Sequence, residues 1–187
     1  MKLTSIQGIP LEYIQSILKI DLTSPSELTW LPREDGTKSW NTKHANKHAG
    51  YLYTDNRGYE SWKCTIRYND KKHDIKCSRV VFLLHNGYLT DDKVVDHATN
   101  KSLDNSIENL REATQSQNSQ NSKLRKNNTS GTKGLSWDEK RQKWEAKLYV
   151  NYKKIHIGYF LKSEKENAKK AIEEARKKYH GEFGRDK

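Results

Sequence analysis

Four polar residues in the middle of the chain have the types and the order that a one-metal nuclease requires. Asp96 and His97 are adjacent, and Asn109 and Asn118 follow. A carboxylate can hold a divalent cation, a neutral imidazole can take a proton from water, and the two amides can orient the imidazole and complete the ion's ligands. The set therefore predicts hydrolysis of a phosphodiester bond. Activity should fall as pH drops below the pKa of His97, roughly 6.5 for an unperturbed histidine.

The ligand types also indicate which metal would be used. A carboxylate and an amide supply oxygen ligands, which suit a hard cation, so we expect Mg²⁺ with Mn²⁺ able to substitute. The chain has only two cysteines, Cys64 and Cys77, too few for a four-thiolate zinc site. We expect no structural zinc and predict that both cysteines are reduced thiols in or near a hairpin.

The elements around these residues are predicted as strand, loop, strand and helix. Residues 94–97 form a short apolar strand, and a second extended piece lies around 109–111. Thr114 and Gln117 have the spacing of a capping box, so a helix should begin there and place Asn118 in its first turns. This order could bring the four polar residues together around one ion.

The region before the motif is predicted to be rich in strands. Apolar residues at helical spacing predict a short amphipathic helix over 10–19. Aromatic and β-branched residues over 50–69, a turn at 69–70 and a return over 72–77 predict a hairpin or β-meander. The apolar run 78–86, followed by a glycine that can end a helix, predicts a helix.

The last third of the chain is predicted to form a separate module. Residues 123–132 are polar and lack periodicity, which is typical of a linker. Apolar and polar residues alternate over 143–150, and 154–160 should return as a second strand after a turn at 151–152. A capping box starting at Ser163 should open a helix, with Ala168, Ala171, Ile172, Ala175 and Tyr179 on one face. Three antiparallel strands backed by one helix are the expected architecture.

The positive charge is concentrated in that module. The net charge of the chain is +11, and residues 123–187 carry 19 Lys and Arg against 9 Asp and Glu. The preceding residues carry 16 basic and 15 acidic side chains. Such a field favours binding of a polyanion, since neutralising phosphates releases counterions, although a solubilising surface is the alternative.

We find no membrane-length apolar stretch and no signal peptide, and expect action in the cytoplasm of a host cell.

The motif resembles the HNH (His-Me finger, ββα-metal) endonucleases, in particular the asparagine-bearing branch among phage and intron-encoded homing enzymes. The matching text is Val95-Asp96-His97, Asp104-Asn105 with Ile107-Glu108-Asn109-Leu110-Arg111, and Gln117-Asn118 with Asn121. The resemblance covers roughly residues 25–122. It implies that Asp96 and Asn118 bind the metal, that His97 is the general base and that Asn109 orients it.

The resemblance also suggests DNA contacts within this first region. The segment 78–87 looks like the family's helix before the motif, where an arginine commonly follows a histidine. Ser78 stands in the place of that histidine, so Arg79 is expected only to contact phosphate. Arg111 and Asn121 are further expected DNA contacts.

Residues 128–185 resemble the ethylene-response-factor (APETALA-type) DNA-binding domain, which follows HNH cores in many phage homing endonucleases. The matching segments are 131–137, 143–146, 155–160 and 181–183, with Ala168 and Ala171. The resemblance implies a three-stranded sheet lying in the major groove. The expected DNA contacts are Arg141, Lys143, Lys147, Tyr149, Lys154 and His156. Trp137 and Trp144 could either pack in the core of this module or contact DNA, and we favour the core.

Together these features predict an α+β protein with an HNH nuclease domain over 1–122, a linker over 123–132 and a basic DNA-binding domain over 133–187. The predicted function is metal-dependent cleavage of double-stranded DNA by a homing-type endonuclease that is a monomer or weak dimer. Two alternatives remain. One is a non-enzymatic DNA-binding regulator, and the other is an HNH nuclease of restriction or general DNA metabolism.

Overall fold

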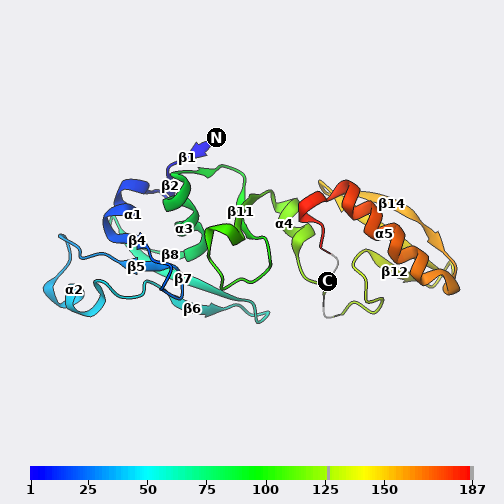
Figure 1. Ribbon diagram of the computed structural model, residues 1–187, viewed down its shortest axis with the longest axis horizontal. Coiled ribbons are helices and arrows are strands. Elements are labelled where there is room, and N and C mark those ends of the chain that lie inside the picture. Colours follow the sequence, from blue (N-terminus) through cyan, green and yellow to red (C-terminus); the bar gives the residue numbers. More distant parts are fainter. Residues whose placement is uncertain (126, 186–187) are drawn as a thin grey trace. The chain divides into compact units, whose positions relative to one another are not determined.

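The computed structural model describes residues 1–125 and 127–185 and combines short helices with small sheets (Figure 1). This mixture agrees with the predicted α+β class. The chain forms two compact units, Met1–Glu112 and Ala113–Lys187. Among the described residues, none of the helices is both long and apolar enough to cross a membrane.

The first unit begins with short elements, most of which bury one or two apolar side chains. These are β1 (Lys2–Leu3), β2 (Ser5–Ile6), β3 (Ile9–Pro10), α1 (Leu11–Ile17), β4 (Leu18–Ile20), β5 (Leu28–Trp30) and α2 (Lys38–His44). Helix α1 is shorter than the predicted helix over 10–19. The reason is that Leu18 leaves the helical region and β4 pairs antiparallel with β5.

The predicted β-meander is confirmed. Strands β6 (Tyr51–Thr54), β7 (Glu60–Tyr68) and β8 (Lys71–Lys76) form an antiparallel three-stranded sheet. The turn between β7 and β8 uses Asn69 and Asp70, both with positive φ. Asparagine and aspartate tolerate that left-handed conformation better than other non-glycine residues.

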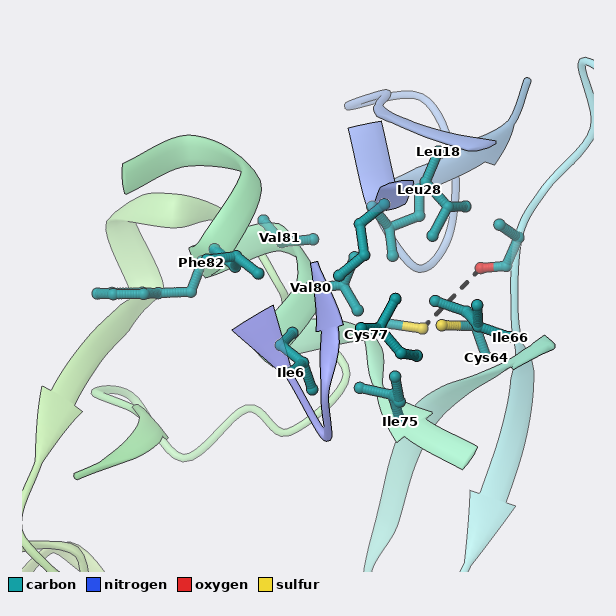
Figure 2. Close-up of a cluster of buried hydrophobic side chains, with 14 of the residues drawn as sticks. Ile6, Leu18, Leu28, Cys64, Ile66, Ile75, Cys77, Val80, Val81 and Phe82 are labelled. Atoms are coloured by element: carbon teal, nitrogen blue, oxygen red, sulfur yellow. Dashed lines mark hydrogen bonds between the residues drawn. The ribbon is translucent and has the colours of Figure 1, made fainter. Parts of the chain in front are cut away.

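Helix α3 (Cys77–Asn86) is buried in the first unit and confirms the predicted helix over 78–86. It ends at Gly87, whose positive φ allows its N–H to donate to the Leu83 carbonyl. Ile and Leu side chains from the elements before the meander pack with α3 and with the inner face of the sheet (Figure 2). This apolar cluster is the core of the first unit.

Both cysteines lie in that core as free thiols, as predicted. The Cys77 Sγ lies 3.9 Å from the Ala49 carbonyl oxygen, its hydrogen-bond acceptor (Figure 2). Hydrogen bonding with Cys64, together with burial, raises the pKa of the Cys77 thiol. A neutral buried thiol behaves as a small apolar side chain and not as a nucleophile.

The strands and helix predicted for the motif follow α3. They are β9 (Leu89–Thr90), β10 (Val94–His97), the 3-10 turn η1 (Ile107–Asn109), β11 (Leu110–Ala113) and α4 (Gln115–Asn121). Strand β9 pairs with β1, and β10 with β11. The predicted capping box is present, because Thr114 accepts from the Gln117 N–H and the Gln117 side chain accepts from the Thr114 N–H.

The second unit contains the predicted three strands and one helix. Strands β12 (Leu135–Asp138), β13 (Lys143–Val150) and β14 (Lys153–Phe160) form an antiparallel sheet, followed by η2 (Lys162–Glu164), α5 (Lys165–Tyr179) and η3 (Gly181–Phe183). Ala168 and Ile172 of α5 pack against Leu135, Ala146 and Leu148 of the sheet. This small cluster is the core of the unit.

Two predictions about α5 were wrong. The helix begins at Lys165 without a side-chain cap, so Ser163 does not form the predicted capping box. A 3-10 turn precedes it instead, closed by the Leu161 N–H donating to the Glu164 carboxylate at 2.9 Å. Tyr179 was placed on the core face, yet it is exposed, and Arg176 is the buried residue in that turn.

Helix α4 packs within the second unit, although the predicted nuclease domain extends to residue 122. The Lys133 ammonium donates to the carbonyl oxygens of Ser119, Gln120 and Ser122 at the C-terminal end of the helix. The Asn151 N–H donates to the Ser116 hydroxyl. Burial lowers the pKa of Lys133 to about 8. The boundary between the compact units thus lies between Glu112 and Ala113. The predicted end of the nuclease domain at residue 122 concerns function, and it stays a prediction.

Candidate active site

Asp96 and His97 end strand β10 and are both buried, with 6% and 9% of their surface exposed. The strand packs against α3, whose apolar face excludes water from one side. Buried polar side chains at the end of a strand require hydrogen-bond partners. The identity of those partners indicates what each side chain can do.

The partner of the His97 imidazole is Asn105. Its Oδ1 lies 3.1 Å from Nε2 of His97, and its amide Nδ2 donates to the Ser26 carbonyl oxygen at 3.1 Å. The bond to Ser26 fixes which end of the amide is the donor, so Oδ1 must accept from Nε2–H. Neutral His97 then carries its proton on Nε2 and has its lone pair on Nδ1. The fully buried Asn105 therefore orients the His97 imidazole and selects its neutral tautomer.

Burial lowers the pKa of His97, although the hydrogen bond that His97 donates to Asn105 and the charge of Asp96 act in the opposite direction. The neutral imidazole that a general base needs is therefore favoured at neutral pH. The value of roughly 6.5 expected from sequence applies to an unperturbed histidine and is too high for this site.

Asn109 was predicted to orient the imidazole, but its side chain has other partners. Its Oδ1 accepts from both the N–H and the hydroxyl of Thr99, at 2.9 and 2.7 Å. Its Nδ2 donates to the carbonyl oxygens of Lys101 and Asp104, at 3.3 and 2.7 Å. These four bonds use the full capacity of one carboxamide. Asn109 thus fixes the loop between β10 and β11, and Asn105 has the orienting position predicted for Asn109.

Asp96 forms an ion pair with Arg111, which faces it from β11. The Arg111 Nε donates to the Asp96 Oδ2 at 3.1 Å, and the Arg111 side chain is mostly buried. Arg111 was predicted to contact DNA. Its position beside Asp96 means that it also holds this carboxylate in place.

The donor set fits a hard divalent cation. The candidate protein ligands, Asp96 and Asn118, both offer oxygen atoms. Among the described residues there is no group of three His, Cys, Asp or Glu side chains that could enclose a metal. Magnesium usually binds one or two protein carboxylates and keeps water and phosphate oxygens as its other ligands, so a full protein cage is not required.

Asn118 lies on α4, directly after the capping box at Thr114. Because α4 belongs to the second unit, the role of Asn118 as a ligand beside Asp96 stays a prediction. Asn121, on the same helix, was predicted to contact DNA but is buried, with 4% of its surface exposed. Arg79 lies on α3 and is half-buried.

The predicted DNA-binding face of the second unit is organised by an acidic residue. The Glu145 carboxylate, on β13, accepts a hydrogen bond from Lys147 and one from Lys154, the latter at 2.6 Å. The His156 Nδ1 lies 3.8 Å from the same carboxylate. These bonds from Lys147 and Lys154 lower the pKa of Glu145. Sequence analysis placed Glu145 on the polar face but did not identify it as the centre of this network.

The other expected contacts on this face are more open. Tyr149 is 55% exposed and Lys143 is exposed. Arg141 pairs with Asp138 at 3.0 Å, and its guanidinium lies over the Tyr159 ring.

The two tryptophans with open roles lie edge to face, with ring centroids 5.1 Å apart. Trp144 is partly buried against the core of the second unit, and its indole N–H donates to the Lys162 carbonyl oxygen. This agrees with the favoured place of Trp144 in the core.

The protein family of the chain follows from these elements together with the comparison to known families. Residues 76–120, which include β10, β11 and most of α4, match the family model described as HNH endonuclease. This segment is an HNH endonuclease domain, which indicates a nuclease acting on nucleic acid. Over 100 residues the chain is 33% identical to protein 3.8 of Escherichia phage T7, covering 54% of this chain and 80% of that protein. The chain therefore belongs to the family of protein 3.8. No solved structure matches it.

No role was predicted for Asn105, although Asp104-Asn105 is part of the motif. Asn100, Asn105 and Asn109 all lie between the histidine and β11, and spacing alone did not separate these three asparagines. The hydrogen bond to the distant Ser26 carbonyl distinguishes Asn105.

Proposed function

We propose that the protein is a metal-dependent DNA endonuclease in which His97 is the general base. The observation that carries this proposal is the chain of hydrogen bonds from Ser26 through Asn105 to His97, within a segment that matches the HNH endonucleases. It holds the imidazole in one orientation and places the proton of the neutral form on Nε2. A regulator that only binds DNA has no need of a buried histidine held in one tautomer.

In the proposed reaction, Nδ1 of His97 removes a proton from a water molecule as that water attacks the phosphorus atom. Asn105 positions the imidazole through its Oδ1, and one of its amide N–H groups donates to the Ser26 carbonyl oxygen. Arg111 keeps the Asp96 carboxylate oriented. Asp96 and Asn118 would hold Mg²⁺, and Mn²⁺ should substitute for it. When bound, the ion would stabilise negative charge on the phosphate and on the departing 3′ oxygen.

We further propose that the second unit binds double-stranded DNA through the polar face of its sheet. The support is its excess of basic residues together with exposed Lys143 and Tyr149 on β13. The relation of this unit to the ethylene-response-factor domain, and a role in homing, are parts of the proposal that rest on sequence resemblance.

A plasmid-nicking assay tests the catalytic proposal directly. The wild-type protein should nick supercoiled plasmid with Mg²⁺ and not with EDTA. His97→Ala should lose this activity by at least about a hundredfold, since general-base catalysis contributes that much. Its affinity for duplex DNA, measured in EDTA, should stay within about twofold of wild type. Undiminished nicking by the variant would exclude His97 as the base.

A further inference from the structure

A cavity in the first unit is lined by aromatic rings and cations and contains none of the residues of the candidate active site. Its volume is about 420 Å³, within the range of small-ligand pockets. It lies between α2, the loop that follows α2, and the strands of the β-meander. The lining residues are Trp30, Arg33, Trp40, His44, His48, Gly50, Tyr51, Cys64, Thr65, Arg67 and Lys72.

One wall of the cavity is aromatic. Trp40 lies on α2 with its ring edge to face against Trp30, the centroids 5.7 Å apart. The His44 ring lies 5.1 Å from the Trp40 ring, and Tyr51 is 41% exposed at the mouth. Trp40 is held in place because Thr37 caps α2 and the Asn41 side chain exchanges hydrogen bonds with the backbone of Arg33. The Arg33 guanidinium also lies over the Trp40 ring, 5.2 Å from its centroid, so a flat ring at this wall would stack beside that cation or replace it.

The opposite wall is cationic. Arg67 on β7 and Lys72 on β8 are cross-strand neighbours and both are exposed. Like charges facing each other across a sheet are destabilising, and neither side chain has an ion pair within the described part of the chain. An anion between them would remove that repulsion. The lining includes no Asp or Glu side chain.

The wider surroundings are also basic. Residues 38–76 carry nine Lys and Arg against four Asp and Glu. The first unit as a whole is nearly balanced in charge, so this segment is a local positive region separate from the basic second unit. It would attract a nucleic acid independently of that unit.

A third observation comes from His48. Its ring stands edge to face against Trp62, and its Nε2 is buried without a hydrogen-bond partner among the described residues. This nitrogen is shielded from solvent, so a ligand would reach it only if the ring turned toward the cavity. The lining thus offers aromatic rings together with the cations of Arg67 and Lys72.

We propose that this cavity binds one unpaired nucleotide of a nucleic acid, with the base against Trp40 and a phosphate against Arg67 and Lys72. A cationic ligand would be repelled by the lining, and a bare phosphate would not use the aromatic wall. A paired base presents only its edges, whereas an unpaired base offers its face for stacking. The site would thus recognise a strand opened or distorted near the point of cleavage.

The test compares two fluorescently labelled duplexes that differ by one extrahelical thymidine. Affinities of the full chain are measured by anisotropy in EDTA, so that binding is scored without cleavage and independently of the nuclease proposal. The wild-type protein should bind the duplex with the extra thymidine about tenfold more tightly, as one stacked base allows. Trp40→Ala should bind both duplexes equally, and Trp40→Phe should retain most of the preference.

Two adjacent lysines provide a matched control. Lys72 lines the cavity and Lys71, its neighbour on β8, does not, since successive side chains of a strand point to opposite faces. Lys72→Ala should reduce the preference to about threefold, as expected for one lost phosphate contact, while Lys71→Ala should leave it at about tenfold. Both changes remove one positive charge at an exposed position. Equal effects of the two changes, or no preference in the wild-type protein, would overturn the proposal.

Discussion

The two units differ in what holds them together. The first unit buries a cluster of 18 apolar residues, whereas the second buries 5 and places a carboxylate among lysines on its sheet. A large core can hold buried polar groups such as His97 and Asn105 in one arrangement, which general-base catalysis requires. A thin sheet with a charged face is suited to long-range attraction of a polyanion. This contrast supports the proposal that precise positioning and DNA affinity belong to different parts of the chain.

Removing residues 123–187 is the strongest test of this division. Most of the excess positive charge leaves with that segment, so the affinity for duplex DNA should fall by about a thousandfold near physiological salt. The slope of log affinity against log salt concentration should also become shallower. Anisotropy titrations at several salt concentrations measure both quantities. Unchanged affinity would mean that binding is not divided between the units as proposed.

Lys133→Met is the control for that truncation. It removes the donor to the C-terminal carbonyls of α4 and leaves the lysines of the sheet in place. Because α4 carries Asn118, nicking should fall while duplex affinity stays within about threefold. If affinity falls as far as in the truncated protein, the loss reflects misfolding of the second unit.

The positioning role of Asn105 gives the next largest effect. Asn105→Ala should lower kcat of nicking by about tenfold to a hundredfold with little change in KM, as for other residues that orient a functional histidine. Without the acceptor at Nε2 the imidazole loses its fixed tautomer, so the pH profile should change as well. Asn109→Ala is the comparison, because its hydrogen bonds fix the loop and not the imidazole. A changed pH profile in Asn109→Ala alone would reverse the two roles.

The smallest effect concerns the charged face of the second unit. Hydrogen bonds from Lys147 and Lys154 lower the pKa of Glu145 below its usual 4.5. A carboxyl group whose pKa is lower in the folded protein than in the unfolded chain stabilises the fold at pH values above the pKa of the unfolded chain. This stabilisation is lost as the pH falls through the pKa of the folded protein. Thermal melts should therefore show a loss of about 1 kcal/mol or less as pH decreases below 4.5, since both lysines are partly solvated. Glu145→Gln should remove this pH dependence. An unchanged dependence in the variant would assign it to other carboxyls.

The meander and the HNH segment that follows it are parts of the fold that the sequence predicted well. Local patterns were sufficient for the meander, for α3 with its terminal glycine, and for α4 with its Thr114 capping box. Each of these signals acts within a few residues, so it can be seen without knowing the fold. The start of α5 was missed because a 3-10 turn closed by Glu164 competed with the predicted cap at Ser163.

The sequence by itself determined which chemistry is available, since Asp96 and His97 are adjacent and the elements around them follow from local patterns. Only the tertiary structure decided which asparagine holds the imidazole, because that choice depends on Ser26, far away in the chain. It also decided that α4 is capped by Lys133, and it brought Trp40, Arg67 and Lys72 around one cavity. These features depend on contacts between distant segments, and residue spacing does not encode such contacts.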